Sequence, residues 1–365
     1  EEVYVPSEPA LLGPGAMSNA PDRLDGFHSF NRCCRGSADK GRSKSNLASY
    51  TTDRRAFEFW SDGNWITANK LMGAINSDPD LMQEFCSNHG NGNNHPRPCS
   101  ADHIGPISLG FSHRAAFQLL CKPCNSAKNN RMYYSDVQNL ITAEHAGAIV
   151  TSWYADSVWQ RLKNRVHNKE DALRLSRIMR DNRYNALLLL GEFLRSGECL
   201  FLYTFLNLEY AQYSYEIEHL NVDDNHIVTA HFGRTESNLK YVRIQQSRKV
   251  RVAFKALDEY YQKDNRNGLA VSVAENDRFF KECIRILAAL NTRYSAQYRM
   301  LRSTIETTDA TDSSYIEIIQ SIPPLTNEPE IQACKELSIR IMDNIAIVLA
   351  SMWDDDRYTR EQDNQ

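Results

Sequence analysis

The spacing of apolar residues divides the chain into a helical majority and one short segment of a different kind. After Met132 apolar residues recur at intervals of three and four, which is typical of helices that bury one face. We expect helices at 137–166, 169–193, 234–261, 277–303 and 331–352, and a lone strand at 227–232. Upstream, 66–85 predicts two short helices that are divided at Ser77–Pro79.

Residues 86–131 follow neither a helical nor a simple strand period. Cysteines, histidines and turn-forming residues alternate there with short apolar stretches, and 104–107 and 117–120 are the predicted strands. A segment this small cannot hold its shape by core packing alone, so we expect a metal to staple it. The predicted fold class is therefore mainly α with a small zinc-stapled module, α+β overall.

Composition shifts along the chain suggest four parts. Prolines and glycines crowd residues 1–31, which we expect to form an extended arm or linker. Residues 32–85 combine a basic segment with the helices that lead into the stapled module at 86–135. Residues 136–365 should then form a mainly helical domain.

The overall charge limits the kinds of partner. Lys and Arg number 42 and Asp and Glu 46, so the formal net charge of the 365-residue chain is −4. A protein that coats nucleic acid through a general positive charge is thus excluded, and an anionic partner must be met locally. No apolar stretch approaches the ~20 residues of a membrane span, so no membrane association is predicted.

The chain ends and the cysteine count bear on location. Nine cysteines, an odd number, fit a reducing compartment better than a disulfide framework, so the cytoplasm is expected. No leader pattern follows Glu1, and we therefore expect no signal peptide. We interpret the sequence as a fragment, with room for a recognition domain before Glu1.

Four cysteines have the spacing of a structural zinc site. Cys121-x2-Cys124 forms one knuckle, and two more ligands must come from a separate piece of chain to complete a tetrahedron. Cys86 and Cys99 are the predicted partners, with His89 an alternative to Cys99. Buried thiols that bind no metal are the simpler interpretation. A zinc held by four protein ligands has no open position for catalysis.

Asp102-His103 lies between the two halves of this staple, and Asn125 directly follows the second knuckle. Here the stretches DHIGPISLG, LLC-x2-C and NSAKNNR resemble the HNH, or ββα-metal, nucleases. The resemblance implies that Asp102 and Asn125 hold a catalytic metal and that His103 acts on the attacking water. Family members often carry an Asn near the position of Ala116, where it orients the catalytic loop.

Three side chains could replace that missing Asn: His113, Gln118 and Asn129. For His113 an exposed loop histidine is the simpler interpretation. The residue types of the implied site suit hydrolysis independently of the resemblance, because a histidine with an unperturbed pKa near 6.5 can take a proton from water at neutral pH. One carboxylate and one amide oxygen, completed by waters and phosphate, suit Mg2+.

The long flanks resemble type IIS restriction endonucleases, whose cleavage module is HNH. Double-stranded DNA is then the expected partner, with a homodimer to cut both strands. Cations expected to contact phosphates are Lys128, Arg131, Arg243, Arg248, Lys249 and Arg251, although a solvated helix face explains the same residues. Two alternatives stay open: a zinc-stapled binding module without catalysis, and another HNH nuclease of the mobile-element or colicin-like kind.

Overall fold

The computed structural model describes residues 56–84, 86–87, 98–262, 268–307 and 312–359. Helices dominate these residues, and one four-stranded antiparallel sheet accompanies them, so the predicted α+β class is confirmed. The expected arm and the basic stretch up to residue 55 lie outside the described residues. Within the described part of the chain, none of the helices has the length and apolar character that a bilayer crossing requires.

The sheet joins distant parts of the sequence in the order β1-β2-β4-β3. Its strands are β1 (Cys99–His103), β2 (Ala116–Cys121), β3 (Tyr213–Val222) and β4 (Ile227–Glu236). The prediction of a lone strand is wrong, because β4 pairs with β3 on one side and with β2 on the other. The strand expected at 104–107 is also wrong, since the chain leaves β1 at His103 and turns through Pro106 into a 3-10 helix.

Helix α4 (Trp65–Ile75) packs on this sheet and gives it a core of its own. The side chain of Asn64 caps the helix by accepting the backbone N–H groups of Ile66 and Thr67, each at 3.2 Å. Leu71 and Ile75 of α4 are fully buried in one apolar cluster with Phe117 of β2 and Val228 of β4. The break predicted after α4 is confirmed, because α5 (Pro79–Glu84) starts at the expected proline.

The long helices agree with the apolar pattern, except where the chain breaks it. α9 (Lys169–Arg195) and α15 (Pro329–Ser351) are confirmed. The helix expected at 137–166 divides into α7 (Tyr134–His145) and α8 (Asp156–Leu162), because Gly147 has a φ of 89° just after α7. The helix expected at 277–303 divides likewise at Tyr294.

The remaining helices complete the larger core. They are α3 (Ala56–Trp60), α6 (Lys122–Lys128), α10 (Cys199–Tyr203), α11 (Leu239–Gln262), α12 (Ala274–Arg293), α13 (Ser295–Glu306), α14 (Ile316–Ser321) and α16 (Asp356–Thr359). Short 3-10 helices lie at Ile107–Leu109, Lys163–Arg165, Leu208–Gln212 and Asp312–Tyr315. The start predicted for the helix at 234 is wrong, since Arg234 belongs to β4 and α11 begins at Leu239.

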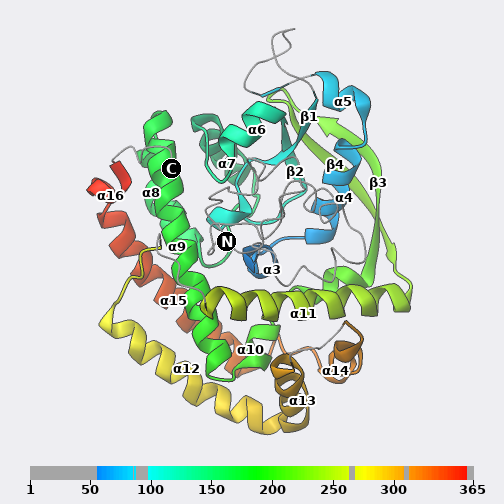
Figure 1. Ribbon diagram of the computed structural model, residues 1–365, viewed down its shortest axis with the longest axis vertical. Helices are drawn as coiled ribbons and strands as arrows, with labels where there is room; N and C mark the ends of the chain where they lie inside the picture. The colour runs from blue at the N-terminus through cyan, green and yellow to red at the C-terminus, as the bar shows by residue number, and fades with distance from the viewer. Residues whose placement is uncertain (1–55, 85, 88–97, 263–267, 308–311, 360–365) are drawn as a thin grey trace, which may run out of the picture.

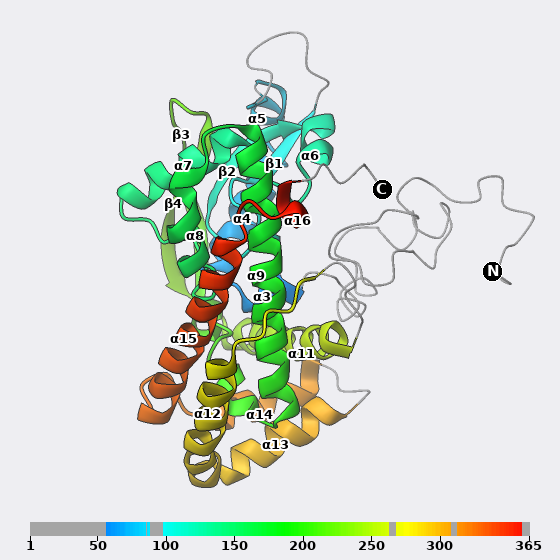
Figure 2. The same ribbon diagram turned by 90° about the vertical axis from the view of Figure 1, so that its left-hand side faces the viewer.

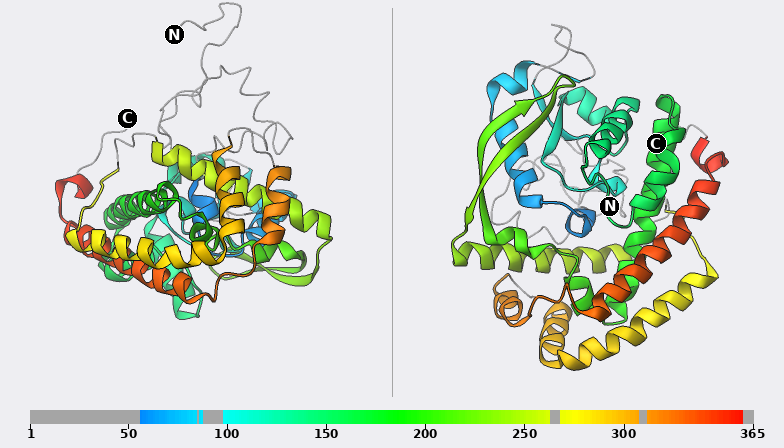
Figure 3. Two further views of the ribbon diagram at one scale, coloured as in Figure 1. Left: turned by 90° about the horizontal axis from the view of Figure 1, so that it is seen from below. Right: turned by 180° about the vertical axis from the view of Figure 1, so that it is seen from behind.

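Figure 1 shows the sheet with α4 and α6 in one half of the molecule and α10, α12, α13 and α14 in the other, with α11 crossing between them. α9 and α15 run side by side along the flank and connect the two halves, as Figure 2 and the rear view in Figure 3 show. The loop between β1 and β2 belongs to the helical core, where Phe111 meets Trp159 edge to face at 5.3 Å. The hairpin is therefore held by the helical part as well as by its own sheet.

Candidate metal-dependent nuclease site

The candidate site is built on a β-hairpin followed directly by a helix. β1 ends at His103, and in the antiparallel register its first residue, Cys99, lies opposite Cys121 at the end of β2. Helix α6 begins at the next residue, Lys122, and packs against both strands. Asp102 and His103 thus lie at the far end of the hairpin from Cys99 and Cys121.

Three of the four predicted zinc ligands meet in the structure. Ligand atoms of Cys86, Cys121 and Cys124 all lie within 4.8 Å of one another, and all three residues are buried. The backbone N–H of Cys121 donates to the sulfur of Cys86 at 3.4 Å, which holds Cys86 beside the knuckle. These side chains fit a tetrahedral zinc. Cys99 is buried beside them but outside this trio, and His89 lies outside the described residues, so the fourth ligand stays a prediction.

Lys128 does not lie on a solvated helix face, and its expected contact with DNA phosphates is wrong for this fold. Its side chain is 0% exposed, with the ammonium 2.6 Å from Asp102 Oδ2 and 3.2 Å from Asp136 Oδ2. It also donates to the backbone oxygens of His103 at 2.8 Å and Ile104 at 3.2 Å. Burial alone would lower the pKa of Lys128, but the two carboxylates outweigh it and raise the pKa. The lysine is an internal charge that fixes the end of β1.

Each of the two predicted metal ligands, Asp102 and Asn125, has one side-chain oxygen to which no described residue donates a hydrogen bond. Lys128 and Gln118 both donate to Oδ2 of Asp102, at 2.6 and 3.1 Å, and no hydrogen bond from the described residues reaches its Oδ1. The amide nitrogen of Asn125 donates to the hydroxyl of Ser100 at 2.8 Å, and within the described ranges its Oδ1 accepts nothing. Ser100 and Asp102 alternate to the same side of β1. A carboxylate oxygen and an amide oxygen therefore remain at this side of the strand, and they suit a hard cation.

His113, of the three side chains considered, lies beside the proposed base. The rings of His103 and His113 have centroids 5.2 Å apart, and Phe117 contacts His103 from the opposite strand at 4.7 Å. Gln118 instead bonds the carboxylates around Lys128, and Asn129 ends α6 at a φ of 45°. His113 is only 4% exposed, so its interpretation as an exposed loop histidine is wrong.

The helical part holds the loop that carries His113. The backbone N–H of His113 donates to the carbonyl of Asp62 at 2.7 Å, and that of Ser112 donates to the carbonyl of Val150 at 2.9 Å. Gly63 lies so close to this loop that an added Cβ would be 2.5 Å from the carbonyl oxygen of His113. Backbone contacts from outside the hairpin thus fix the loop in the absence of an Asn at Ala116.

The comparisons with known proteins identify the family of this chain. The model of a family described as Type II restriction endonuclease (RE_Alw26IDE) matches residues 1–350. The chain belongs to this family. A search of curated proteins and a search of solved structures gave no match. The family confirms the prediction of a restriction endonuclease, and hence of a DNA endonuclease whose substrate is DNA.

In this type II restriction endonuclease, the basic residues predicted on α11 do not form one exposed face. Lys249 is 3% exposed and Arg251 6%, because α11 packs against α3, α9 and α14. The ammonium of Lys249 lies 4.7 Å from the ring centroid of Trp65, and burial lowers its pKa to about 7. The expected DNA contacts of Lys249 and Arg251 are therefore wrong in this fold, whereas Arg243 and Arg248 are half-buried and stay predictions.

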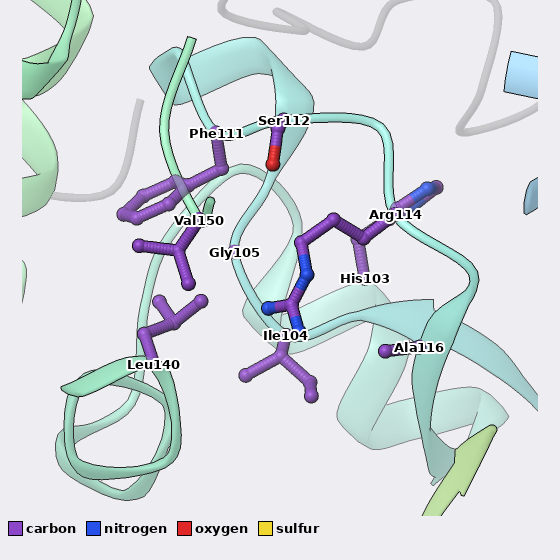
Figure 4. A pocket seen from close by; sticks show the side chains of 9 residues that line it. All are labelled: His103, Ile104, Gly105, Phe111, Ser112, Arg114, Ala116, Leu140 and Val150. Carbon is purple, nitrogen blue, oxygen red and sulfur yellow. The ribbon is translucent and has the colours of Figure 1, made fainter. Parts of the chain in front are cut away.

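Sequence reasoning missed two residues of the candidate site. In the sequence Asp136 is only an acidic residue near the start of a helix, but in the structure its carboxylate accepts the backbone N–H of Tyr133 and pairs with the buried Lys128. Arg114 follows His113 in a loop where no pattern marks it, and it lines a small pocket together with His103 (Figure 4). Only the folded chain brings these groups to the end of β1.

Proposed function

We propose that this chain is an HNH-type, Mg2+-dependent endonuclease that hydrolyses double-stranded DNA, of the type IIS kind that cuts to one side of its recognition sequence. The proposal is carried by two oxygens that no hydrogen bond from the described residues reaches, Asp102 Oδ1 and Asn125 Oδ1, beside the histidine that follows Asp102 in β1. Membership in the restriction endonuclease family supports a metal at these oxygens, because attack on a phosphodiester of DNA requires a cation that neutralises the charge of the phosphate.

The metal-binding role falls to Asp102 and Asn125. When bound, Mg2+ would neutralise the charge that develops on the phosphate and on the leaving oxygen. The ion pair with Lys128 fixes the orientation of the Asp102 carboxylate through Oδ2. That fixed orientation leaves Oδ1 as the ligand, so no reorganisation of the carboxylate is needed when the ion binds.

The proton-transfer role falls to His103. Its neutral imidazole would accept a proton from water as that water attacks phosphorus and the bond to the 3′ oxygen of the DNA breaks. The ring of His103 contacts Phe117 and His113, and a backbone hydrogen bond to Asp62 fixes the loop that carries His113. A base held in this way needs little reorientation before it acts.

Arg131 and α9 support a path for DNA beside this site. Arg131 is exposed just after α6, and Arg180 of α9 donates to the backbone oxygen of Asn130 at 3.3 Å. Burial, together with the nearby guanidinium groups of Arg183 and Arg131, lowers the pKa of Arg180 to about 10. Arg131 is the exposed member of this group, so it is the one proposed to contact a DNA backbone.

The buried cysteine trio supports a structural role for zinc, distinct from the exchangeable Mg2+. It joins Cys86 to the knuckle at Cys121 and Cys124, and so ties the chain before β1 to the start of α6. Zinc at this position would keep the strand of Asp102 against the helix of Asn125. A second copy of the chain is proposed for cleavage of the other strand.

The test is cleavage of a long DNA of known sequence, followed by sequencing of every cut end. Wild-type protein with Mg2+ should give ends at one fixed offset from one short sequence, and EDTA should abolish them. Ends at scattered sequences would favour a colicin-like nuclease instead. Binding without cleavage at any Mg2+ concentration would contradict the proposal and favour a non-catalytic module.

A further inference from the structure

The first half of α11 has an exposed face that combines apolar and polar side chains. Leu239, Tyr241 and Ile244 are 61%, 45% and 41% exposed, which makes this short stretch the densest group of exposed large apolar residues in the described part of the chain. One side of the helix carries, at spacings of three, four and seven residues, Tyr241, Ile244, Gln245 and Arg248. Exposed apolar side chains that gather on one face mark a contact surface.

The charge of α11 indicates the kind of partner. Between Leu239 and Leu257 the helix contains six Lys or Arg residues and no Asp or Glu, although the net charge of the whole chain is −4. Lys240 is exposed and Arg243 is half-buried, and no hydrogen bond or ion pair from the described residues reaches either side-chain cation. A polyanion complements such a surface, and DNA is the polyanion on which this family acts.

The opposite face of α11 fixes the orientation of the helix. Val242 is 8% exposed, and the side-chain amide of Gln246 donates to the carbonyl of Leu208 at 3.0 Å. Just before the helix, the backbone N–H of Ser237 donates to the carbonyl of Gln212 at 3.0 Å. The exposed face therefore belongs to a rigid element, and a partner can bind it without first ordering the helix.

The sheet sets the distance between α11 and the candidate site. Gln118 pairs with Asp102 of β1 and with Ile227, the first residue of β4. β4 ends at Glu236, and α11 begins three residues later, at the edge of the molecule beside the ends of β3 and β4 (Figure 1). The length of β4, at about 3.3 Å per residue, is about 30 Å. This length corresponds to about nine base pairs of B-DNA, so α11 lies beside the candidate site and not in it.

We propose that this face of α11 enters the major groove of the DNA and reads base pairs of the recognition sequence. The inference rests on the proposed function, because a type IIS enzyme cuts to one side of the sequence that it reads. The major groove admits an α-helix, and each base pair presents a distinct pattern there. The amide of Gln245 pairs with N6 and N7 of an adenine, and Ile244 packs against a thymine methyl group. Lys240 and Arg243 bind phosphates at the edges of the groove.

The test is competitive cleavage of DNA in which each base pair of the recognition sequence is varied in turn, after that sequence has been read from the wild-type cut ends. Gln245→Ala should lose about 5- to 150-fold of the wild-type discrimination at one base pair and keep it at the others, because one bidentate contact is removed. Ile244→Ala should lower the discrimination at a neighbouring base pair. Gln138→Ala, which removes an exposed glutamine from α7, is the matched control and should discriminate like the wild type.

Lys240→Gln separates phosphate contact from base reading. Its DNA affinity should fall by a similar factor for every sequence, because a phosphate carries no base identity. The slope of log affinity against log salt concentration should become shallower by about 0.9, since one phosphate contact is lost. An unchanged salt slope would overturn the placement of DNA on this face.

Discrimination is a ratio of cleavage rates on two sequences, so a partly unfolded variant does not change it. Wild-type discrimination at every base pair in both Gln245→Ala and Ile244→Ala refutes this inference, and it leaves the proposed function intact if the wild type cuts at one fixed offset. If light scattering shows that these variants lose a dimer while they keep the wild-type discrimination, the face belongs to a second copy of the chain and the inference is wrong. Scattered cut ends from the wild type would contradict the proposed function and this inference with it.

Discussion

The buried ion pair at Lys128 makes the sharpest prediction about how the site is held together. Replacing Lys128 with Met keeps the length of the side chain and removes its charge. Asp136, whose side chain is 0% exposed, and Asp102, at 14%, would then face each other without a cation. Because both carboxylates stay in the core, the change tests the pair itself and not the packing around it.

The contacts set the size of the effect. Removal of one partner from a buried ion pair costs about 3–5 kcal/mol. Asp136 would keep the N–H groups of Tyr133 at 2.7 Å and Gln118 at 2.8 Å, so we expect about 3 kcal/mol, near the lower limit. At roughly 2 °C per kcal/mol for a large domain, the melting temperature should fall by about 6 °C.

Thermal and urea unfolding of Lys128→Met measure this loss. Lys122→Met on the same helix is the control, because Lys122 is exposed and its removal should change the free energy of unfolding by less than about 0.5 kcal/mol. Adding Asp136→Asn to Lys128→Met should recover part of the loss, since it removes the uncompensated charge. A free energy of unfolding for Lys128→Met within 1 kcal/mol of wild type would refute the reasoning.

Three further predictions concern the supports of the site. Gly63→Ala should lower both the melting temperature and the cleavage rate, because its Cβ would lie 2.5 Å from the carbonyl oxygen of His113 and because its φ is +107°. Gly73→Ala, in open space on α4, is the control and should change neither. Equal melting curves for the two variants would contradict this prediction. The free energy of unfolding should rise with pH between about 7 and 10.4, because Lys249 has released a proton in the folded state that the unfolded chain still holds. In Lys249→Met, the free energy of unfolding measured with urea should depend less on pH over that range. Metal analysis should find about one zinc per chain. Cys121→Ser should lose this zinc and Cys199→Ser should keep it, because Cys199 lies outside the trio. Zinc retained by both variants would contradict the assignment of Cys121 as a zinc ligand.

The apolar period predicted the long helices well, since α9 and α15 each repeat the pattern over many turns. It could not orient α6, because a helix of seven residues has too few turns to show which face is buried. Lys128 is buried because it pairs with Asp102 from a strand and with Asp136 from another helix, and no local sequence pattern predicts these long-range contacts. Strand β3 was missed because a register shift between Ile217 and His219 breaks the alternation of its side chains.

The spacing of the cysteines was more informative than any period. A knuckle at Cys121 and Cys124 demands partners wherever they lie in the chain, and the fold brings Cys86 to them across the hairpin. The spacing could not choose the fourth ligand, since that choice depends on where residues 88–97 lie. Chemical motifs thus predicted a candidate site, whereas the surroundings of that site, at Gly63 and Arg114, follow from contacts between segments far apart in sequence.

The most direct test of the account is the single-turnover cleavage rate of His103→Ala on a cognate DNA, with DNA affinity measured in Ca2+. The account predicts a loss of about 10²-fold or more in rate with affinity unchanged, because the base is removed and no phosphate contact is lost. His145→Ala, at an exposed histidine that ends α7, should cut like the wild type. Cleavage by His103→Ala at the wild-type rate at neutral pH would contradict the placement of the active site at the end of β1.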